Sequence, residues 1–152
     1  MVRWKFFIFL IVLAGCDIYS NDTVYLPRDL VDELNQLYIN NNDVTEIAFC
    51  LTGDDTFIYG FRPAIIRHSE WDGAGFECKM SDVADLHTHP EHDCRMSYDD
   101  IVESQKDSTY AAGIICDVNK YVFWRNGNFT KVYIVERNGT FTDITFETIL
   151  AE

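Results

Sequence analysis

The spacing of apolar residues predicts a helix near the start of the folded part of the chain. Between residues 28 and 39, Leu30, Leu34 and Leu37 recur at intervals that place their side chains on one helix face. The asparagine-rich run at 40–43 ends this pattern. One helix therefore opens the domain, with an apolar face available to pack on a sheet.

Seven segments are predicted to be strands, because apolar residues alternate in them or cluster between turn residues. They cover residues 46–52, 57–61, 83–89, 110–116, 121–125, 129–135 and 140–146. Gly53-Asp54-Asp55 joins the first two as a hairpin, and Asn138-Gly139 predicts another hairpin before the last. Residues 69–75 are loop-like, and residues 76–80 show no clear preference.

A second helix is predicted from Ser97 to about Lys106. Ser97 is a favoured N-cap residue, and Asp100 follows at the capping-box position, with Asp in place of the usual Glu. The order of helix, hairpin, strand, helix and further strands predicts an α/β fold, a mixed sheet flanked by helices. With 152 residues the chain is long enough for one such domain and too short for two.

The N-terminal segment has the organisation of a bacterial lipoprotein signal. Arg3 and Lys5 precede an apolar run at 6–12, and Leu-Ala-Gly-Cys, ending at Cys16, resembles a lipobox. A membrane-spanning helix needs roughly 20 apolar residues, so the expected anchor is lipid on Cys16. The alternatives are an ordinary cleaved signal or a short anchor helix. Asp17 resembles the signal that keeps lipoproteins in the inner membrane, facing the periplasm.

These segments divide the chain into three predicted parts. Residues 1–15 are the signal peptide, residues 16–27 are a polar and aperiodic tether, and residues 28–152 are the folded domain. Hydrophobic residues make up 47% of the chain and aromatic residues 14%, which is enough apolar material for a core. The formal net charge of -13 repels phosphate backbones, so nucleic acid is not expected as a partner.

Cysteine usage predicts two disulfides. Once Cys16 is assigned to lipid, Cys50, Cys78, Cys94 and Cys116 remain, an even number for an oxidising compartment. Cys94 stands just before the second helix, and the strand that returns from this helix ends at Cys116, so we expect these two to pair. By elimination Cys50 pairs with Cys78. Buried free thiols and a structural zinc site are the alternatives, although no close C-x-x-C spacing favours the latter.

A His-x-His pair supplies the candidate chemistry. Residues two apart in a strand point to the same side, so His87 and His89 present two imidazoles on one face while Thr88 faces away. Pro90 ends the strand, and Asp100, near the start of the next helix, can return a carboxylate to the same point. Such a site offers three protein ligands to zinc and leaves the fourth position to water.

Residues 87–100 read His-x-His-Pro, six residues, then Ser-x-x-Asp, which resembles the signature of the JAMM (JAB/MPN/Mov34) zinc metalloproteases. Upstream, Glu46 begins Glu-Ile-Ala-Phe-Cys-Leu-Thr-Gly, which is similar to the family's first strand. Cys94 also lies where many members have a cysteine. The resemblance spans roughly residues 44–125. Because a bare His-x-His arises often by chance, the identification depends on the added proline, serine, aspartate and upstream glutamate.

The resemblance implies a JAB/MPN-like fold and the roles of the site residues. His87, His89 and Asp100 would bind Zn²⁺, Glu46 would move the proton of the attacking water, and Ser97 would donate a hydrogen bond to the oxyanion. The implied reaction is hydrolysis of a peptide or isopeptide amide bond in a protein or peptide substrate.

Two other functions are compatible with the same residues. One is a catalytically silent MPN-like binding module, and the other is a JAB-type toxin or a hydrolase of cell-wall peptides. His92, in the loop after the motif, is either a solvated loop residue or a substrate contact. His68 is expected at the surface.

Overall fold

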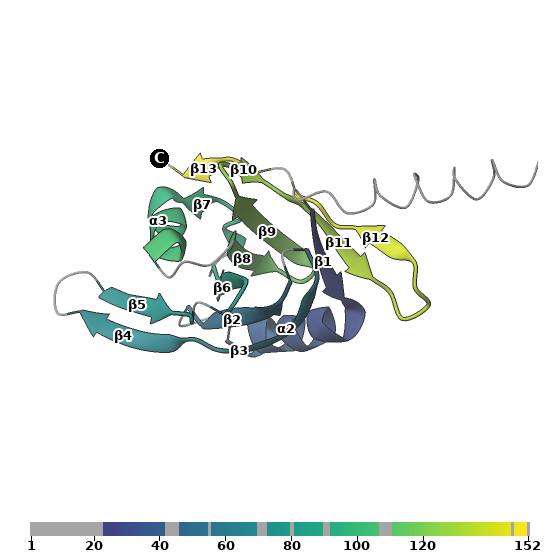
Figure 1. Ribbon diagram of the computed structural model, residues 1–152, viewed down its shortest axis with the longest axis horizontal. Coiled ribbons are helices and arrows are strands. Elements are labelled where there is room, and N and C mark those ends of the chain that lie inside the picture. The colour runs from purple at the N-terminus through teal and green to yellow at the C-terminus, as the bar shows by residue number, and fades with distance from the viewer. Residues whose placement is uncertain are drawn as a thin grey trace, which may run out of the picture.

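The computed structural model describes residues 23–41, 46–54, 56–69, 73–79, 81–89, 92–106, 111–146 and 148–151. In order along the chain, its elements are β1 (Thr23–Pro27), α2 (Arg28–Asn41), β2 (Ala48–Gly53), β3 (Ile58–Pro63), β4 (Ile65–Ser69), β5 (Gly73–Glu77), β6 (Ala84–Thr88), β7 (Met96–Ser97), α3 (Tyr98–Lys106), β8 (Ala111–Asp117), β9 (Lys120–Arg125), β10 (Asn128–Phe129), β11 (Lys131–Val135), β12 (Phe141–Asp143) and β13 (Leu150–Ala151). They form the mixed α/β fold that the sequence predicts (Figure 1).

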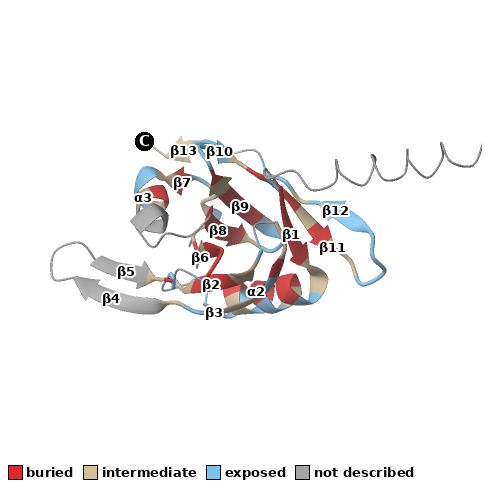
Figure 2. Ribbon diagram, in the orientation of Figure 1, coloured by how far each residue is buried: buried red, intermediate tan, exposed pale blue. Residues whose placement is uncertain are grey.

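A six-stranded sheet in the order β10-β9-β8-β6-β2-β3 lies at the centre of the molecule. Its strands pair antiparallel except for the central pair, β6 and β8, which is parallel. These central strands are largely buried (Figure 2). Parallel neighbours need a crossover, and the connection from β6 to β8 contains β7 and α3.

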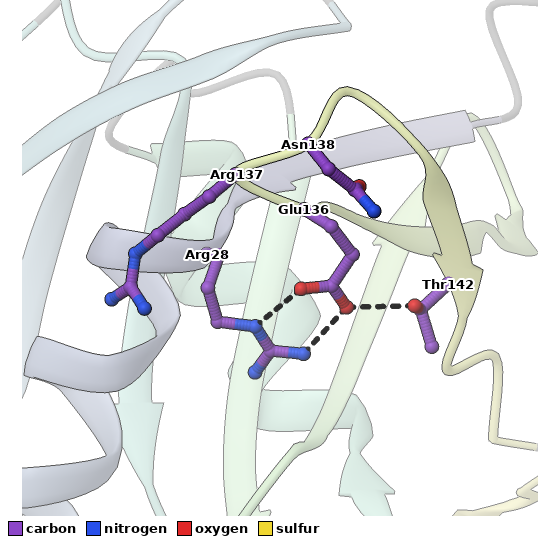
Figure 3. Close-up of a pocket in the computed structure, with 5 residues that line it drawn as sticks. All are labelled: Arg28, Glu136, Arg137, Asn138 and Thr142. Atoms are coloured by element: carbon purple, nitrogen blue, oxygen red, sulfur yellow. Dashed lines mark hydrogen bonds and ion pairs between the residues drawn. The ribbon is translucent and has the colours of Figure 1, made fainter.

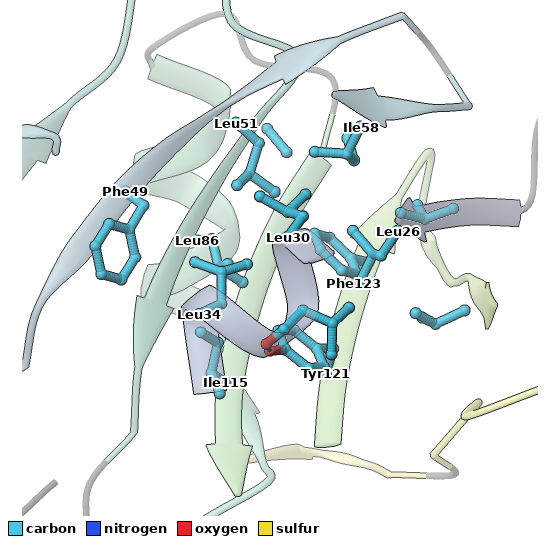
Figure 4. Packing of buried hydrophobic residues seen from close by; sticks show 14 of the residues in the cluster. Leu26, Leu30, Leu34, Phe49, Leu51, Ile58, Leu86, Ile115, Tyr121 and Phe123 are labelled. Atoms are coloured by element: carbon cyan, nitrogen blue, oxygen red, sulfur yellow. Dashed lines mark hydrogen bonds between the residues drawn. The ribbon is translucent and has the colours of Figure 1, made fainter. Parts of the chain in front are cut away.

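The two faces of this sheet are covered by different helices. Leu30 and Leu34 of α2 pack over one face, in the same cluster as Leu86 and Phe123 (Figure 4). The other face carries a smaller cluster in which Ile101 of α3 packs with Met96, Ile114 and Val122. Successive strand residues therefore alternate between an α2 face and an α3 face.

A second sheet, in the order β1-β11-β12, corrects the predicted domain boundary. Thr23–Pro27 is a strand parallel to β11 and not the end of a tether. Val24, Tyr25 and Leu26 are all at least 96% buried. A parallel strand covered on both sides shows no alternation of apolar and polar residues, so the sequence of this segment does not indicate a strand.

Three further predictions differ from the structure. Residues 65–69 and 73–77 form the hairpin β4–β5, where a loop and an ambiguous segment were expected. The single strand expected at 129–135 is divided, because β10 belongs to the six-stranded sheet and β11 to the second sheet. The strand expected at 140–146 is limited to Phe141–Asp143, and β13, which no pattern indicated, pairs with β7.

Both expected disulfides are present. Cys50 is bonded to Cys78 and Cys94 to Cys116, with Cα–Cα distances of 5.4 and 5.0 Å. The alternatives of free thiols and of a four-cysteine zinc site are therefore wrong. The predicted signal peptide and Cys16 lie outside the described residues. Within the described part of the chain, no helix is long and apolar enough to cross a membrane.

Candidate metal centre

The strand β6 places both motif histidines on the α3 face of the sheet. Leu86 and Thr88 face α2, so His87 and the following His89 face the opposite side. The Thr88 hydroxyl oxygen accepts a hydrogen bond from the backbone amide of Ile47 at 3.0 Å, and Thr88 is 3% exposed. Thr88 thus faces away from the histidines, as the sequence predicts, and fixes the chain just before β2.

Glu46 lies on the same face as the two histidines. Ala48 pairs with His87 in the antiparallel β2–β6 ladder, and the Thr88 amide donates to the Ile47 carbonyl at 2.9 Å. Continuing this register by one residue places Glu46 opposite His89, and side chains of opposed residues share a face. Glu46 is exposed, and its negative charge is one of the smaller influences on the pKa of each histidine.

Asp100 and Ser97 form the capping box at the start of α3. The Ser97 amide donates to Asp100 Oδ2 at 2.7 Å, and the Asp100 amide donates to Ser97 Oγ at 3.1 Å. This reciprocal pair fixes the Asp100 carboxylate in the first turn. The Ser97 hydroxyl also interacts with the Asp100 carboxylate and is one of the smaller causes that lower the pKa of Asp100.

The three predicted metal ligands converge on one point. His87 Nε2 lies 3.0 Å from His89 Nε2 and 3.2 Å from Asp100 Oδ1, and His89 Nε2 lies 3.6 Å from Asp100 Oδ2. Zinc bonds of about 2.0–2.1 Å in a tetrahedral arrangement hold neighbouring ligand atoms about 3.3 Å apart. The two imidazoles and the carboxylate therefore fit a zinc ion in spacing as well as in chemistry.

A further contact orients His89. Its Nδ1 lies 3.0 Å from the backbone carbonyl oxygen of Asp93. When Nδ1–H donates to this carbonyl, the lone pair is on Nε2, the nitrogen that faces His87 and Asp100. The His89 backbone amide also donates to the Ile115 carbonyl at 2.9 Å, so ring and backbone are both held.

The electrostatics of the cluster favour the metal-binding form of Asp100 and of His89 but not that of His87. Burial raises the pKa of Asp100, but the hydrogen bond and charge of His87, with the Ser97 amide, outweigh it and bring this pKa to about 2. Burial and the charge of His87 lower the pKa of His89. Burial also lowers the pKa of His87, but the hydrogen bond and charge of Asp100 outweigh it and raise this pKa. Near neutral pH Asp100 is thus ionised and His89 is neutral.

His92 belongs to a different group of residues. Its Nδ1 lies 3.5 Å from Asp117 Oδ1 and 3.4 Å from the Tyr38 hydroxyl oxygen, on the side of α2, and its backbone φ is 59°. The structure thus gives no support to His92 as a substrate contact. A second set of close potential ligands, Cys50, Cys78 and Asp82, offers no thiolates because the two cysteines are bonded to each other.

A surface pocket lies far from the metal centre. It has a volume of about 470 Å³ and is lined by Arg28, Glu136, Arg137, Asn138 and Thr142 (Figure 3). The lining residues come from the start of α2 and from the turn between β11 and β12, whereas α3 is at the other end of the molecule (Figure 1). Arg28 donates to both carboxylate oxygens of Glu136, at 2.8 and 2.7 Å.

The comparisons with known proteins support the fold. No family model matches the chain, and no curated protein matches it in sequence. A crystal structure of a JAB1/MPN domain protein from Archaeoglobus fulgidus matches with a TM-score of 0.54 and 18% identity, over 74% of this chain and 100% of that chain. At this identity the likeness shows the fold, which is of the JAB1/MPN type, and the site must be argued from its own residues.

Proposed function

We propose that the chain is a zinc-dependent hydrolase of peptide or isopeptide amide bonds. The observation that carries this proposal is the convergence of His87, His89 and Asp100 at the ligand spacing of zinc, with Glu46 on the same face. The JAB1/MPN-type fold supports it independently, because the fold likeness does not depend on the identity of these side chains.

Each residue has a role that its position allows. His87, His89 and Asp100 hold the ion, and zinc bound there supplies Lewis-acid chemistry that makes water a nucleophile near neutral pH. Glu46 accepts a proton from the attacking water and returns it to the amine that leaves when the C–N bond breaks. The Ser97 hydroxyl donates a hydrogen bond to the carbonyl oxygen as that oxygen gains negative charge, and the N-terminus of α3 favours the same charge.

Metal content and a glutamate variant test the proposal together. We expect about one zinc ion per chain in the purified protein, as for a mononuclear site. Glu46→Gln should keep the metal and lose turnover by about 10²–10⁴-fold, because an amide cannot accept the proton. Activity is screened on periplasmic proteins, on peptides and on cross-linked cell-wall peptides. An active Glu46→Gln protein would remove this residue from the mechanism.

The same experiment separates the two alternative functions. A chain that binds zinc but hydrolyses none of these substrates is a binding module of the same fold. Selective cleavage of cell-wall peptides assigns the chain to the toxin or cell-wall class, whose centre would have the same geometry.

We also propose that the protein is a lipoprotein of the bacterial inner membrane, anchored through Cys16 and facing the periplasm. The lipobox-like end of the signal supports this, and the two disulfides suit an oxidising compartment. Cys16→Ala should abolish labelling by a fatty-acid analogue, because the thiol is the acylation point. Equal labelling of wild type and variant would contradict the anchor.

A further inference from the structure

The segment 92–97 carries two parts of the metal centre, and within it the described side-chain hydrogen bonds join Arg95 to Asp93. It holds the Asp93 carbonyl that orients His89, and it ends at Ser97, which caps α3. Between these residues the chain has no regular structure until the two-residue strand β7. Its position must therefore be set by contacts with distant parts of the chain.

Cys94, at the middle of this segment, is held from two sides. Its sulfur is bonded to Cys116 at the end of β8. Its carbonyl oxygen accepts a hydrogen bond of 2.7 Å from the hydroxyl of Thr148, which lies 54 residues later in the chain. The residue before Cys94 is Asp93, so a shift of Cys94 moves the carbonyl on which His89 depends.

The strand β13 continues this contact along β7. Leu150 pairs with Met96 and Ala151 with Ser97 in a parallel ladder. Leu150 also packs against the apolar cluster around Met96 and Ile101, which anchors β13 to the α3 face of the sheet. The segment 148–151 thus runs parallel to 94–97.

We propose that β13, through Thr148, is a positioning element of the metal centre. Thr148 acts on the three metal ligands only indirectly: it fixes the Cys94 carbonyl, and through Asp93 and Ser97 in the same segment it holds His89 and Asp100 at their mutual spacing. This role rests on the proposed zinc site. Ligand geometry is sensitive to such support, since losing a direct outer contact of a ligand costs about 10–100-fold in metal affinity.

The test compares zinc affinity in three variants by competition with a chromophoric chelator. Thr148→Val removes the hydroxyl with little change of shape and should weaken zinc binding by about three- to tenfold, less than a direct outer contact because Thr148 acts through one residue more. Thr148→Ser restores the donor and should restore the affinity. Thr142→Val is the matched control, because the Thr142 hydroxyl also donates at 2.7 Å, to Glu136 at the other end of the molecule, and its loss should leave zinc affinity unchanged.

The absorption spectrum of the cobalt-loaded protein adds a readout of ligand geometry, and thermal midpoints show whether each variant is folded. A spectrum altered in Thr148→Val and restored in Thr148→Ser supports the positioning role. Equal zinc affinity in wild type and Thr148→Val overturns it. So does weakened binding that Thr148→Ser fails to restore. A wild-type protein that binds no zinc contradicts the proposed function itself, before any variant is measured.

Discussion

The metal centre and the arginine cluster at the opposite end of the molecule use similar side chains in opposite ways. In the arginine cluster, which comprises Arg28, Asp29, Asp32, Glu136 and Arg137, every carboxylate meets a guanidinium. Arg28 pairs with Glu136, and Arg137 reaches Asp29 and Asp32 at 2.7 and 2.9 Å. In the metal centre three electron-pair donors face one another, and among the described residues no lysine or arginine pairs with Asp100.

This difference separates a structural cluster from a binding site. Guanidinium and carboxylate groups attract and orient each other, so the arginine cluster needs little support from the rest of the fold. In the metal centre His87 and Asp100 attract each other, but the two imidazoles do not, so the backbone must hold His89 beside His87 until a cation is bound. The structure provides this support in the capping box, the Asp93 carbonyl and the Cys94–Cys116 bond.

Removing a metal ligand should cause the largest loss of zinc binding. His87→Ala, His89→Ala and Asp100→Ala should each lower zinc affinity by more than about 100-fold, because a direct ligand contributes more than an outer contact. The measurement is zinc content after dialysis, together with chelator competition. Arg28→Ala is the control. This variant leaves carboxylates of the arginine cluster without a guanidinium partner but adds no imidazole, so its zinc content should equal that of the wild type. Unchanged metal content in all three ligand variants would show that the centre is not a zinc site.

Acid should weaken the metal centre next most strongly. His87 must lose its proton to bind zinc, and Asp100 raises its pKa above the ordinary 6.5. Zinc affinity should therefore fall as the pH drops through this raised pKa, by about tenfold per pH unit below it. Asp100, with a pKa of about 2, and His89, with a lowered pKa, keep their binding forms over this range. An affinity independent of pH between 7.5 and 5.5 would contradict the assignment of His87.

Much of the metal centre was predictable because its determinants are local. The two-residue period of a strand puts His87 and His89 on one face, and the capping box places Asp100 three residues after Ser97. The helix–strand geometry after Cys94 was also enough to suggest its bond to Cys116. The role of Glu46 could not be predicted from this residue alone. Only the resemblance of residues 46–53 to the family's first strand distinguished Glu46 from an ordinary surface charge.

The parts that escaped prediction depend on distant partners. Thr23–Pro27 is a strand because Lys131–Val135 lies beside it. Nothing in the sequence of either segment indicates that the two pair. Residues 150–151 are a strand because β7 lies beside them. The strand propensity of a segment decides less than the strands that lie beside it, so the sequence around Thr148 does not indicate its contact with Cys94.

Removing one disulfide at a time should separate the stability of the fold from the support of the metal centre. The chain separations are 22 residues for Cys94–Cys116 and 28 for Cys50–Cys78, so replacing either pair by serine should destabilise the fold by a similar amount, about 3 kcal/mol. Loss of Cys94–Cys116 should in addition weaken zinc binding by about three- to tenfold, because it frees the segment that carries the Asp93 carbonyl. Loss of Cys50–Cys78 should not. Chelator competition and thermal unfolding of both double variants decide this, and equal zinc affinities would mean that the bond acts on stability alone.

The smallest effect is expected at the arginine cluster. Arg28→Met keeps the aliphatic part of the side chain and removes its pairing with Glu136, a half-buried ion pair near the surface of the kind that contributes little. The thermal midpoint should fall by no more than a few degrees at pH 7, and zinc affinity should not change. The hydrogen bond and charge of Arg28 lower the pKa of Glu136 from 4.5 to about 2. A lowered carboxylate pKa means that the stabilisation is present above pH 4.5 and is lost as the pH falls towards 2. The difference between Arg28→Met and wild type should therefore disappear in thermal scans near pH 2, and a difference that persists there would show that Arg28 stabilises the fold by packing and not by charge.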